Sequence, residues 1–140
     1  MTEPFPIPFL GFVAFSGTGK TTLLTRLIPE LKLLSLRCAV IKHSHHDFSV
    51  DIPGKDSHRL SEAGAEQVLL EGFRQTAIAK IEVHRPSRGT PLICRHDPNV
   101  IALACDVPPD EQVQLPLLAL NEPGDVAAFV AAWLQRVRVD

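Results

Sequence analysis

A loop of small residues near the N-terminus constrains this chain more than any other feature. An apolar run ends at Phe15, residues 16–22 (SGTGKTT) follow, and a leucine-rich stretch comes next. Small residues let backbone N–H groups turn toward phosphate oxygens, and the helix behind them adds the positive end of its dipole. This order predicts a phosphate-binding P-loop between a strand and a helix. A chance Gly-Lys-Thr in an ordinary turn is the alternative, and it leaves the matching order of strand, loop, lysine, threonine and helix unexplained.

The loop supplies a set of candidate nucleotide ligands. They are Ser16, Gly17, Thr18, Gly19, Lys20, Thr21 and Thr22. In a P-loop the lysine reaches the β- and γ-phosphates and the hydroxyl that follows it binds Mg²⁺. The usual pattern opens with glycine, and Ala14 stands there instead. A methyl group restricts the backbone at this position without excluding the loop.

A P-loop enzyme also needs an acidic group beside the Mg²⁺ ion. Two candidates follow expected strands, namely Asp47 and Glu71. Glu71 comes directly after an apolar run, where a Walker-B acid belongs, so Lys20 and Glu71 are the candidate catalytic residues. The alternative role of Glu71 is that of a solvated carboxylate at a strand end.

Length and composition restrict the class of protein. At 140 residues, we expect one domain spanning the whole chain. The net charge of −2 gives no indication of nonspecific binding to nucleic acid or to an anionic membrane surface, and no apolar run approaches the ~20 residues of a membrane span. Three cysteines far apart in the sequence and no recognisable signal peptide favour free thiols and a cytoplasmic location.

Apolar runs alternate with amphipathic stretches along the chain. Strands are expected at residues 9–15, 38–42, 66–70, 78–84, 100–105 and 117–120, and helices at residues 20–35 and 125–138. The alternation predicts a three-layer α/β P-loop NTPase fold with a mostly parallel central sheet. Ligands of such folds gather at the carboxyl ends of the strands. The loop, the residues after position 42, Glu71 and Asp106 would therefore meet at one edge.

Three local features lead to further expectations. Pro29 lies inside the first helical stretch, so we expect a kink or break near Ile28. Asp125 follows a Pro-Gly pair and is the expected cap of the terminal helix. Polar and apolar residues alternate over residues 78–84, which favours a half-exposed edge strand and, through its open edge, a homodimer.

Half of the six histidines occur within four residues, followed by an aspartate. His43, His45, His46 and Lys55 are candidate contacts for a substrate or a partner protein, chiefly through phosphate. A polar loop whose histidines bond the backbone ranks second. A Zn²⁺ or Ni²⁺ site that includes Asp47 ranks third, because three histidines so close in a loop rarely all face one metal ion.

Asp106 follows the apolar strand at residues 100–105. A carboxylate there can accept two hydrogen bonds from the guanine base, which adenine does not offer. Its structural alternative is to cap the turn before Pro108. The complete Asn-Lys-x-Asp guanine motif is absent, so Asp106 alone is a weak signal for GTP.

Taken together, these segments resemble the molybdopterin-guanine dinucleotide biosynthesis protein B (MobB) family. The resemblance rests on residues 14–22 (AFSGTGKTT), 40–47 (VIKHSHHD), 51–57 (DIPGKDS), 63–65 (AGA), 71–74 (EGFR), 79–81 (AKI) and 100–106 (VIALACD). It implies a dimer that binds GTP with Mg²⁺ and hydrolyses it slowly. It also implies two partners, the molybdenum cofactor guanylyltransferase and molybdopterin itself.

One departure from the family pattern concerns the middle of the chain. Family members carry a helix and a further strand between the AGA and EGFR segments, whereas only residues 66–70 lie between them here. We therefore expect an interruption, with one consecutive pair between Ala65 and Glu71 beyond the ~3.8 Å Cα separation of bonded neighbours.

Two other functions remain open at this point. A small-molecule kinase could use the same P-loop, but its lid would need arginines, and only Arg85, Arg88 and Arg95 are placed to supply them. A nucleotide-dependent metal chaperone could use the histidine loop to deliver an ion. The expected function is that of a GTP-binding accessory protein.

Overall fold

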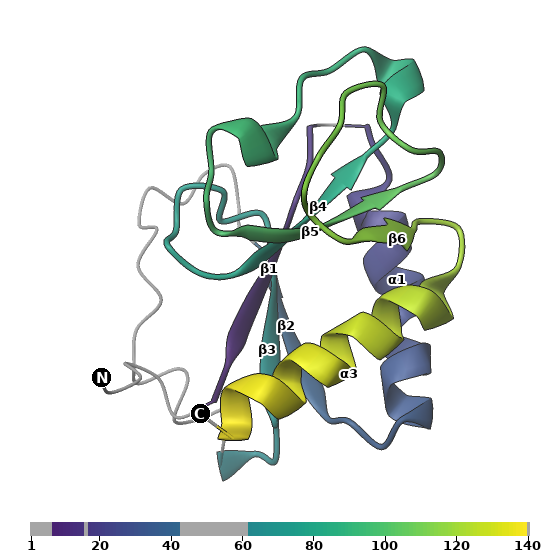
Figure 1. Ribbon diagram of the computed structural model, residues 1–140. Helices are drawn as coiled ribbons and strands as arrows, with labels where there is room; N and C mark the ends of the chain where they lie inside the picture. The colour runs from purple at the N-terminus through teal and green to yellow at the C-terminus, as the bar shows by residue number, and fades with distance from the viewer. Residues whose placement is uncertain (1–6, 16, 43–61, 140) are drawn as a thin grey trace.

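The computed structural model describes residues 7–15, 17–42 and 62–139 (Figure 1). The strands are β1 (Phe9–Val13), β2 (Cys38–Lys42), β3 (Gln67–Glu71), β4 (Lys80–His84), β5 (Val100–Cys105) and β6 (Leu117–Ala119). The α-helices are α1 (Lys20–Leu33) and α3 (Pro123–Val139), and two 3₁₀ turns, η1 (Pro86–Arg88) and η2 (Ile93–Arg95), lie between β4 and β5.

The strands form one parallel sheet in the order β2-β3-β1-β4-β5-β6. Parallel pairing needs crossover connections, and it brings the carboxyl ends of all the strands to one edge of the sheet. The predicted α/β fold with a parallel sheet is confirmed. The P-loop after β1, Glu71 at the end of β3 and Asp106 after β5 all lie at that edge, as expected.

The prediction for β4 is wrong. This strand lies between β1 and β5 in the middle of the sheet, and all five of its residues are buried. Its alternating polar residues Lys80, Glu82 and His84 point into a covered face, not into solvent. The exposed edges of the sheet belong to β2 and β6.

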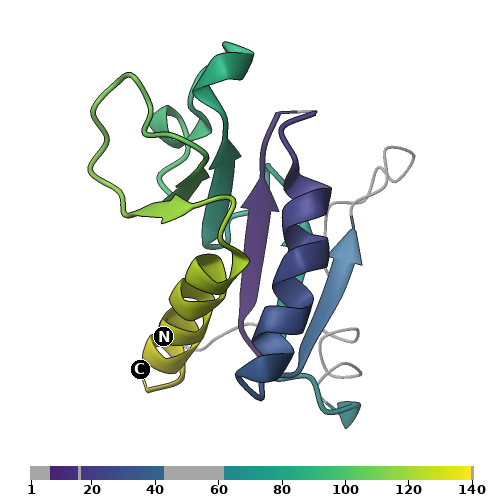
Figure 2. The same cartoon turned by 90° about the vertical axis from the view of Figure 1, so that its right-hand side faces the viewer.

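Helices α1 and α3 lie side by side on one face of the sheet (Figure 2). Leucines of α1 and the apolar side of α3 form the main core with inward residues of the strands. A kink or a break is expected near Ile28, but helix α1 continues through Pro29 to Leu33 without a break. At a proline the helix loses one backbone hydrogen bond, and the packing of Leu27 and Leu31 on the sheet compensates for that loss.

The start of α3 also differs from expectation. The helix begins at Pro123, so Asp125 lies in its first turn and is not the residue that caps it. Its carboxylate accepts a hydrogen bond from the backbone N–H of Ala119 at 2.9 Å. Asp125 therefore fastens the helix to the end of β6, and its charge still suits the positive end of the helix dipole.

The opposite face of the sheet carries two smaller apolar clusters. One joins Phe9, Val68, Leu70 and Phe73 over β1 and β3. The other joins Val13, Ile93 and Val100, where the connection between β4 and β5 covers the sheet. This connection, residues 85–99, buries the polar residues of β4.

The expected interruption between Ala65 and Glu71 is not found. Residues 67–71 pair consecutively with β2 on one side, and residues 68–71 pair consecutively with β1 on the other. The N–H of Glu66 donates to the carbonyl of Arg37, and that of Gly72 donates to Phe12, so the ladder extends past both ends of the strand. One continuous strand therefore connects the AGA and EGFR segments.

Two other expectations concern free cysteine thiols and membrane-spanning segments. Cys38, Cys94 and Cys105 are free thiols, and burial is the main cause that raises the pKa of Cys38 to about 11. Among the described residues, no helix combines the length and apolar character needed to cross a membrane.

Candidate functional site

The loop after β1 has the backbone geometry of a phosphate cradle. Gly17 and Gly19 adopt φ angles of +80° and +101°, a left-handed region that favours glycine. The Thr18 hydroxyl donates to the carbonyl of Phe15 at 2.6 Å and holds the loop closed. Helix α1 follows with Gly19 at its N-cap and no side-chain cap. Its first N–H groups are therefore available to an anion.

The predicted acidic partner of the loop lies where a Mg²⁺ ligand is needed. The Thr21 hydroxyl donates to Oε2 of Glu71 at 2.7 Å, although the two residues are 50 positions apart in the sequence. Glu71 ends β3 beside β1, and the left-handed turn at Gly72 and Phe73 leads the chain away from the site. The structure thus brings Thr21 and Glu71 together as the sequence predicts.

Lys42 is a site residue that the sequence analysis did not select. It ends β2, and its Nζ lies 3.9 Å from Oε2 of Glu71. Its side chain is largely exposed, so this pair contributes little to stability. Its position at the carboxyl end of a strand, directly before the histidine loop, could have indicated that Lys42 belongs to the site.

A cavity of about 440 Å³ lies over the loop. Its lining includes Gly17, Thr18, Gly19, Lys20, Thr21, Thr22, Lys42, Glu71 and Gly72. Two lysines and one carboxylate thus surround a space bounded by the backbone of the loop and the start of α1. The two lysines and the backbone N–H groups suit a phosphate group, and the carboxylate suits a divalent cation bound to that phosphate.

Two arginines from the chain after β4 approach the loop glycines. The Arg85 guanidinium donates from Nε to the carbonyl of Thr18 at 2.8 Å. A Cβ atom at Gly17 would lie 2.6 Å from Nη2 of Arg88, and one at Gly19 would lie 3.3 Å from Nη2 of Arg85. The third arginine considered for a lid, Arg95, pairs with Glu111 elsewhere. Arg85 and Arg88 therefore add positive charge beside the P-loop.

Asp106 lies at the predicted edge but is already hydrogen bonded. Its Oδ2 accepts from Nη1 of Arg85 at 3.1 Å, and its Oδ1 accepts from the N–H of Val107 at 2.9 Å. Arg85 thereby links Asp106 to the P-loop backbone at Thr18. Each carboxylate oxygen can accept a second hydrogen bond, so these contacts leave capacity for a ligand.

The remaining predicted site residues lie outside the described part of the chain. They are Ser16, His43, His45, His46, Asp47 and Lys55. Within residues 7–15, 17–42 and 62–139, no group of three or more His, Cys, Asp or Glu side chains is arranged to hold a metal ion. The roles suggested for the histidine loop stay predictions.

Comparison with known proteins places this site in a family. The family model described as "Molybdopterin guanine dinucleotide synthesis protein B" matches residues 9–71 and 66–106. A molybdopterin-guanine dinucleotide biosynthesis adapter protein from Escherichia coli is 39% identical, over 93% of this chain and 95% of its own length. The chain belongs to the MobB family. The molybdopterin-guanine dinucleotide biosynthesis adapter protein from Haemophilus influenzae is 37% identical, over 91% of this chain and 90% of its own length.

Solved MobB structures share the fold. The MobB homologue from Bacillus stearothermophilus superposes with a TM-score of 0.70 at 16% identity, over 91% of this chain and 98% of its own. MobB from Bacillus subtilis gives the same TM-score at 17% identity, with the same coverage. At this level of identity the likeness establishes the architecture alone.

The MobB comparisons also bear on the short middle of the chain. Residues 66–71 are matched twice by the family model, at the end of the first matched segment and at the start of the second. The alignment with the Escherichia coli relative extends over 168 positions, more than the 140 residues here. The relative therefore has residues without a counterpart in this chain.

Proposed function

We propose that this MobB-family chain is a GTP-binding adapter protein of molybdenum cofactor biosynthesis that hydrolyses GTP slowly. Its partner would be the guanylyltransferase that attaches GMP to molybdopterin, and molybdopterin itself would be a second ligand. The full-length relatives named as adapter proteins support the role in the pathway. The proposed location is the cytoplasm, where this biosynthesis would take place.

The observation that carries the nucleotide part is the contact between Thr21 and Glu71. A hydroxyl on the first turn of a helix and a carboxylate at the end of the neighbouring strand meet at 2.7 Å beside Lys20. Oxygen ligands from these two side chains suit Mg²⁺, which usually keeps several waters and few protein ligands. When bound, Mg²⁺ would neutralise part of the phosphate charge, and GTP would supply the bond that is hydrolysed.

The other residues of the site have separable roles in this proposal. Lys20 and the first N–H groups of α1 bind and orient the phosphates. Arg85 and Arg88 add positive charge beside the loop, where charge on phosphate oxygens is stabilised. Asp106 selects guanine because its carboxylate oxygens can each accept a further hydrogen bond from the base. Slow turnover is expected, because Glu71 is the only described acid at the phosphate end of the cavity.

We also propose that the protein forms a homodimer. Strand β4 has no open edge for pairing between subunits, because it lies between β1 and β5. The open edges are β2 and β6, and Val40 on β2 exposes 44% of its surface. Sedimentation at micromolar concentration measures the state, and a monomer there would remove dimerisation from the proposal.

Base selectivity tests the proposed nucleotide. GTP, ATP and CTP are titrated in turn with Mg²⁺, and the wild type is compared with the Asp106→Asn variant. We expect GTP to bind most tightly and Asp106→Asn to lose that preference, because the amide replaces one acceptor with a donor. A preference for ATP in the wild type would exclude the guanine assignment and would favour the kinase alternative.

A further inference from the structure

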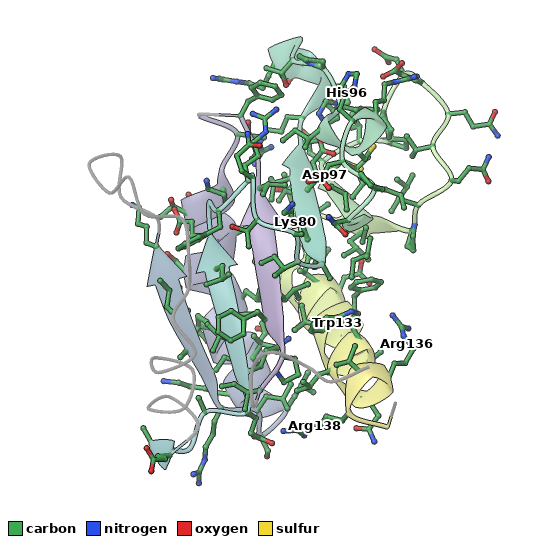
Figure 3. The ribbon with its side chains drawn as sticks, turned by 90° about the vertical axis from the view of Figure 1, so that its left-hand side faces the viewer. Lys80, His96, Asp97, Trp133, Arg136 and Arg138 are labelled. Carbon is green, nitrogen blue, oxygen red and sulfur yellow. The ribbon has the colours of Figure 1, made fainter. Side chains whose placement is uncertain are left out.

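Lys80 is a charged side chain placed in the middle of the sheet. The residue is 1% exposed, and it pairs with Gly11 of β1 in register. A Cβ atom at Gly11 would lie 3.2 Å from Cγ of Lys80, so the missing side chain makes room for the lysine. Figure 3 looks onto this face, where Lys80, Asp97 and His96 follow one another toward the carboxyl edge.

Asp97 is the ion-pair partner of this lysine. Nζ of Lys80 donates to Oδ2 of Asp97 at 2.7 Å, and Oδ1 accepts from the N–H of Asn99 at 2.9 Å. Burial alone would raise the pKa of Asp97, but the hydrogen bonds from Lys80 and Asn99 outweigh it and lower the pKa. Asp97 is therefore ionised at neutral pH and fixed in orientation.

A cavity of about 320 Å³ opens above this pair, and we call it the Lys80 cavity. Its polar lining includes Arg74, Thr76, Lys80, His96, Asp97 and Asn99. The volume is about ten times the ~30 Å³ share of one water molecule, so a small organic molecule fits. The cavity faces away from α1 and α3 and does not include the P-loop.

The Lys80 cavity contains hydrogen-bonding capacity that the described residues leave unused. An ammonium group has three N–H donors, and Asp97 takes one of those of Lys80. The Thr76 hydroxyl is buried and has no partner among the described residues. An ion pair that only anchored the connection between β4 and β5 would need neither the space nor these donors.

The charge of the lining indicates the chemistry of a ligand. Arg74 and Lys80 are positive and Asp97 is negative, so the fixed charges sum to +1 before His96 is counted. A guanidinium and a hydroxyl from the turn after β3 and an ammonium from β4 line the cavity, and this set suits the several terminal oxygens of a phosphate better than a planar carboxylate. We propose that the Lys80 cavity binds a small phosphomonoester through its phosphate group.

The Lys80 cavity and the P-loop cavity share one turn. Glu71 and Gly72 line the P-loop cavity, whereas Arg74 and Thr76 line the Lys80 cavity. The Arg74 guanidinium also lies 4.7 Å from the ring centroid of Phe15, next to the P-loop. A reporter for the Lys80 cavity must therefore lie outside this turn, and Ala77 and Asn99 satisfy that condition.

The test is a titration followed by amide chemical shifts. Inorganic phosphate and glycerol 3-phosphate are added separately to the ¹⁵N-labelled full chain, in the wild type and in Lys20→Ala. We expect the amides of Ala77 and Asn99 to shift saturably in both proteins, with glycerol 3-phosphate binding more tightly. Absence of saturable shifts would overturn the proposal, and so would shifts that vanish in Lys20→Ala, because those would report the P-loop. Stronger binding of free phosphate would overturn the ester assignment.

Two variants separate a ligand site from a structural ion pair. Arg74→Gln should weaken binding at least about tenfold, as loss of a charge-assisted hydrogen bond does. Thr76→Val should weaken it about threefold to tenfold and leave the urea midpoint unchanged or higher, because valine removes an unpaired hydroxyl. Arg136→Gln, on the exposed side of α3, is the matched control and should bind as the wild type does. Unchanged affinity in Arg74→Gln and Thr76→Val would refute the site, whatever the outcome for nucleotide binding.

Discussion

Glu71 is nearly buried, and its carboxylate accepts from Thr21 while it lies close to Lys42. We expect Glu71→Gln to weaken the Mg²⁺-dependent part of GTP binding about tenfold or more, because the amide keeps an acceptor for Thr21 but loses the charge that Mg²⁺ requires. GTP is titrated with Mg²⁺ and again with a chelator. Glu122→Gln, an exposed carboxylate before α3, serves as the control. Equal Mg²⁺ dependence in Glu71→Gln and the wild type would contradict the assigned role.

Sequence predicted part of this site, and the reason differs from residue to residue. Lys20, Thr21 and Glu71 belong to patterns in which chemistry and chain position coincide, so the 2.7 Å contact of Thr21 and Glu71 was predictable. The hydrogen bond of Arg85 to the Thr18 carbonyl depends on where the chain after β4 folds back. No local pattern encodes that approach. Lys42 differs in this respect, because its position at the carboxyl end of β2 was a signal that the sequence analysis did not use.

At the scale of elements, helix α1 contains a proline, Pro29, in its interior, where proline destabilises a helix. Pro29 is exposed, four residues after Thr25, and cannot donate the backbone hydrogen bond of an interior helical position. We expect Pro29→Ala to raise the free energy of unfolding by about 1–2 kcal/mol, less than the ~3 kcal/mol propensity difference because proline also restricts the unfolded chain. Urea denaturation measures the change. A less stable variant would show that α1 is already adapted to the proline.

The connection between β4 and β5 is held to the sheet by the Lys80–Asp97 pair. Asp97→Asn leaves the buried ammonium without its countercharge, so we expect a loss of about 3 kcal/mol at pH 7. The pKa of Asp97 is lowered in the fold. Its contribution is therefore present above the pKa of the unfolded chain, near 4, and disappears as the pH falls below it. Urea unfolding of both proteins from pH 7 to pH 3 should show the difference shrinking. A difference that stays constant with pH would contradict this explanation.

The same connection explains why the predicted position of β4 is wrong. Alternation of polar and apolar residues usually indicates one wet face. Here Lys80 pairs with Asp97, and Glu82 accepts from the N–H groups of Ile93 and Cys94 at 2.7 and 2.8 Å. Burial is the main cause that raises the pKa of Glu82. A period of two residues cannot distinguish solvent from a polar covering segment, whereas β2 and β5 were predicted to the residue from their apolar runs.

At the scale of the whole molecule, we predict one cooperative domain. Trp133, the single tryptophan, is buried in the core that joins α1, α3 and the strands. Its fluorescence and the far-ultraviolet circular dichroism should therefore report one coincident urea transition, as two-state single domains do. Transitions at different urea concentrations would indicate separately unfolding parts.

We expect the P-loop of this MobB-family chain to bind a nucleoside triphosphate. The most direct test compares GTP binding by Lys20→Ala with that by Lys32→Ala, which removes an exposed lysine at the other end of the same helix. We predict that Lys20→Ala weakens binding about a hundredfold or abolishes it, because a charge-assisted contact to phosphate is lost. Lys32→Ala should bind as the wild type does. Equal GTP affinity in Lys20→Ala and the wild type would show that the P-loop is not the nucleotide site.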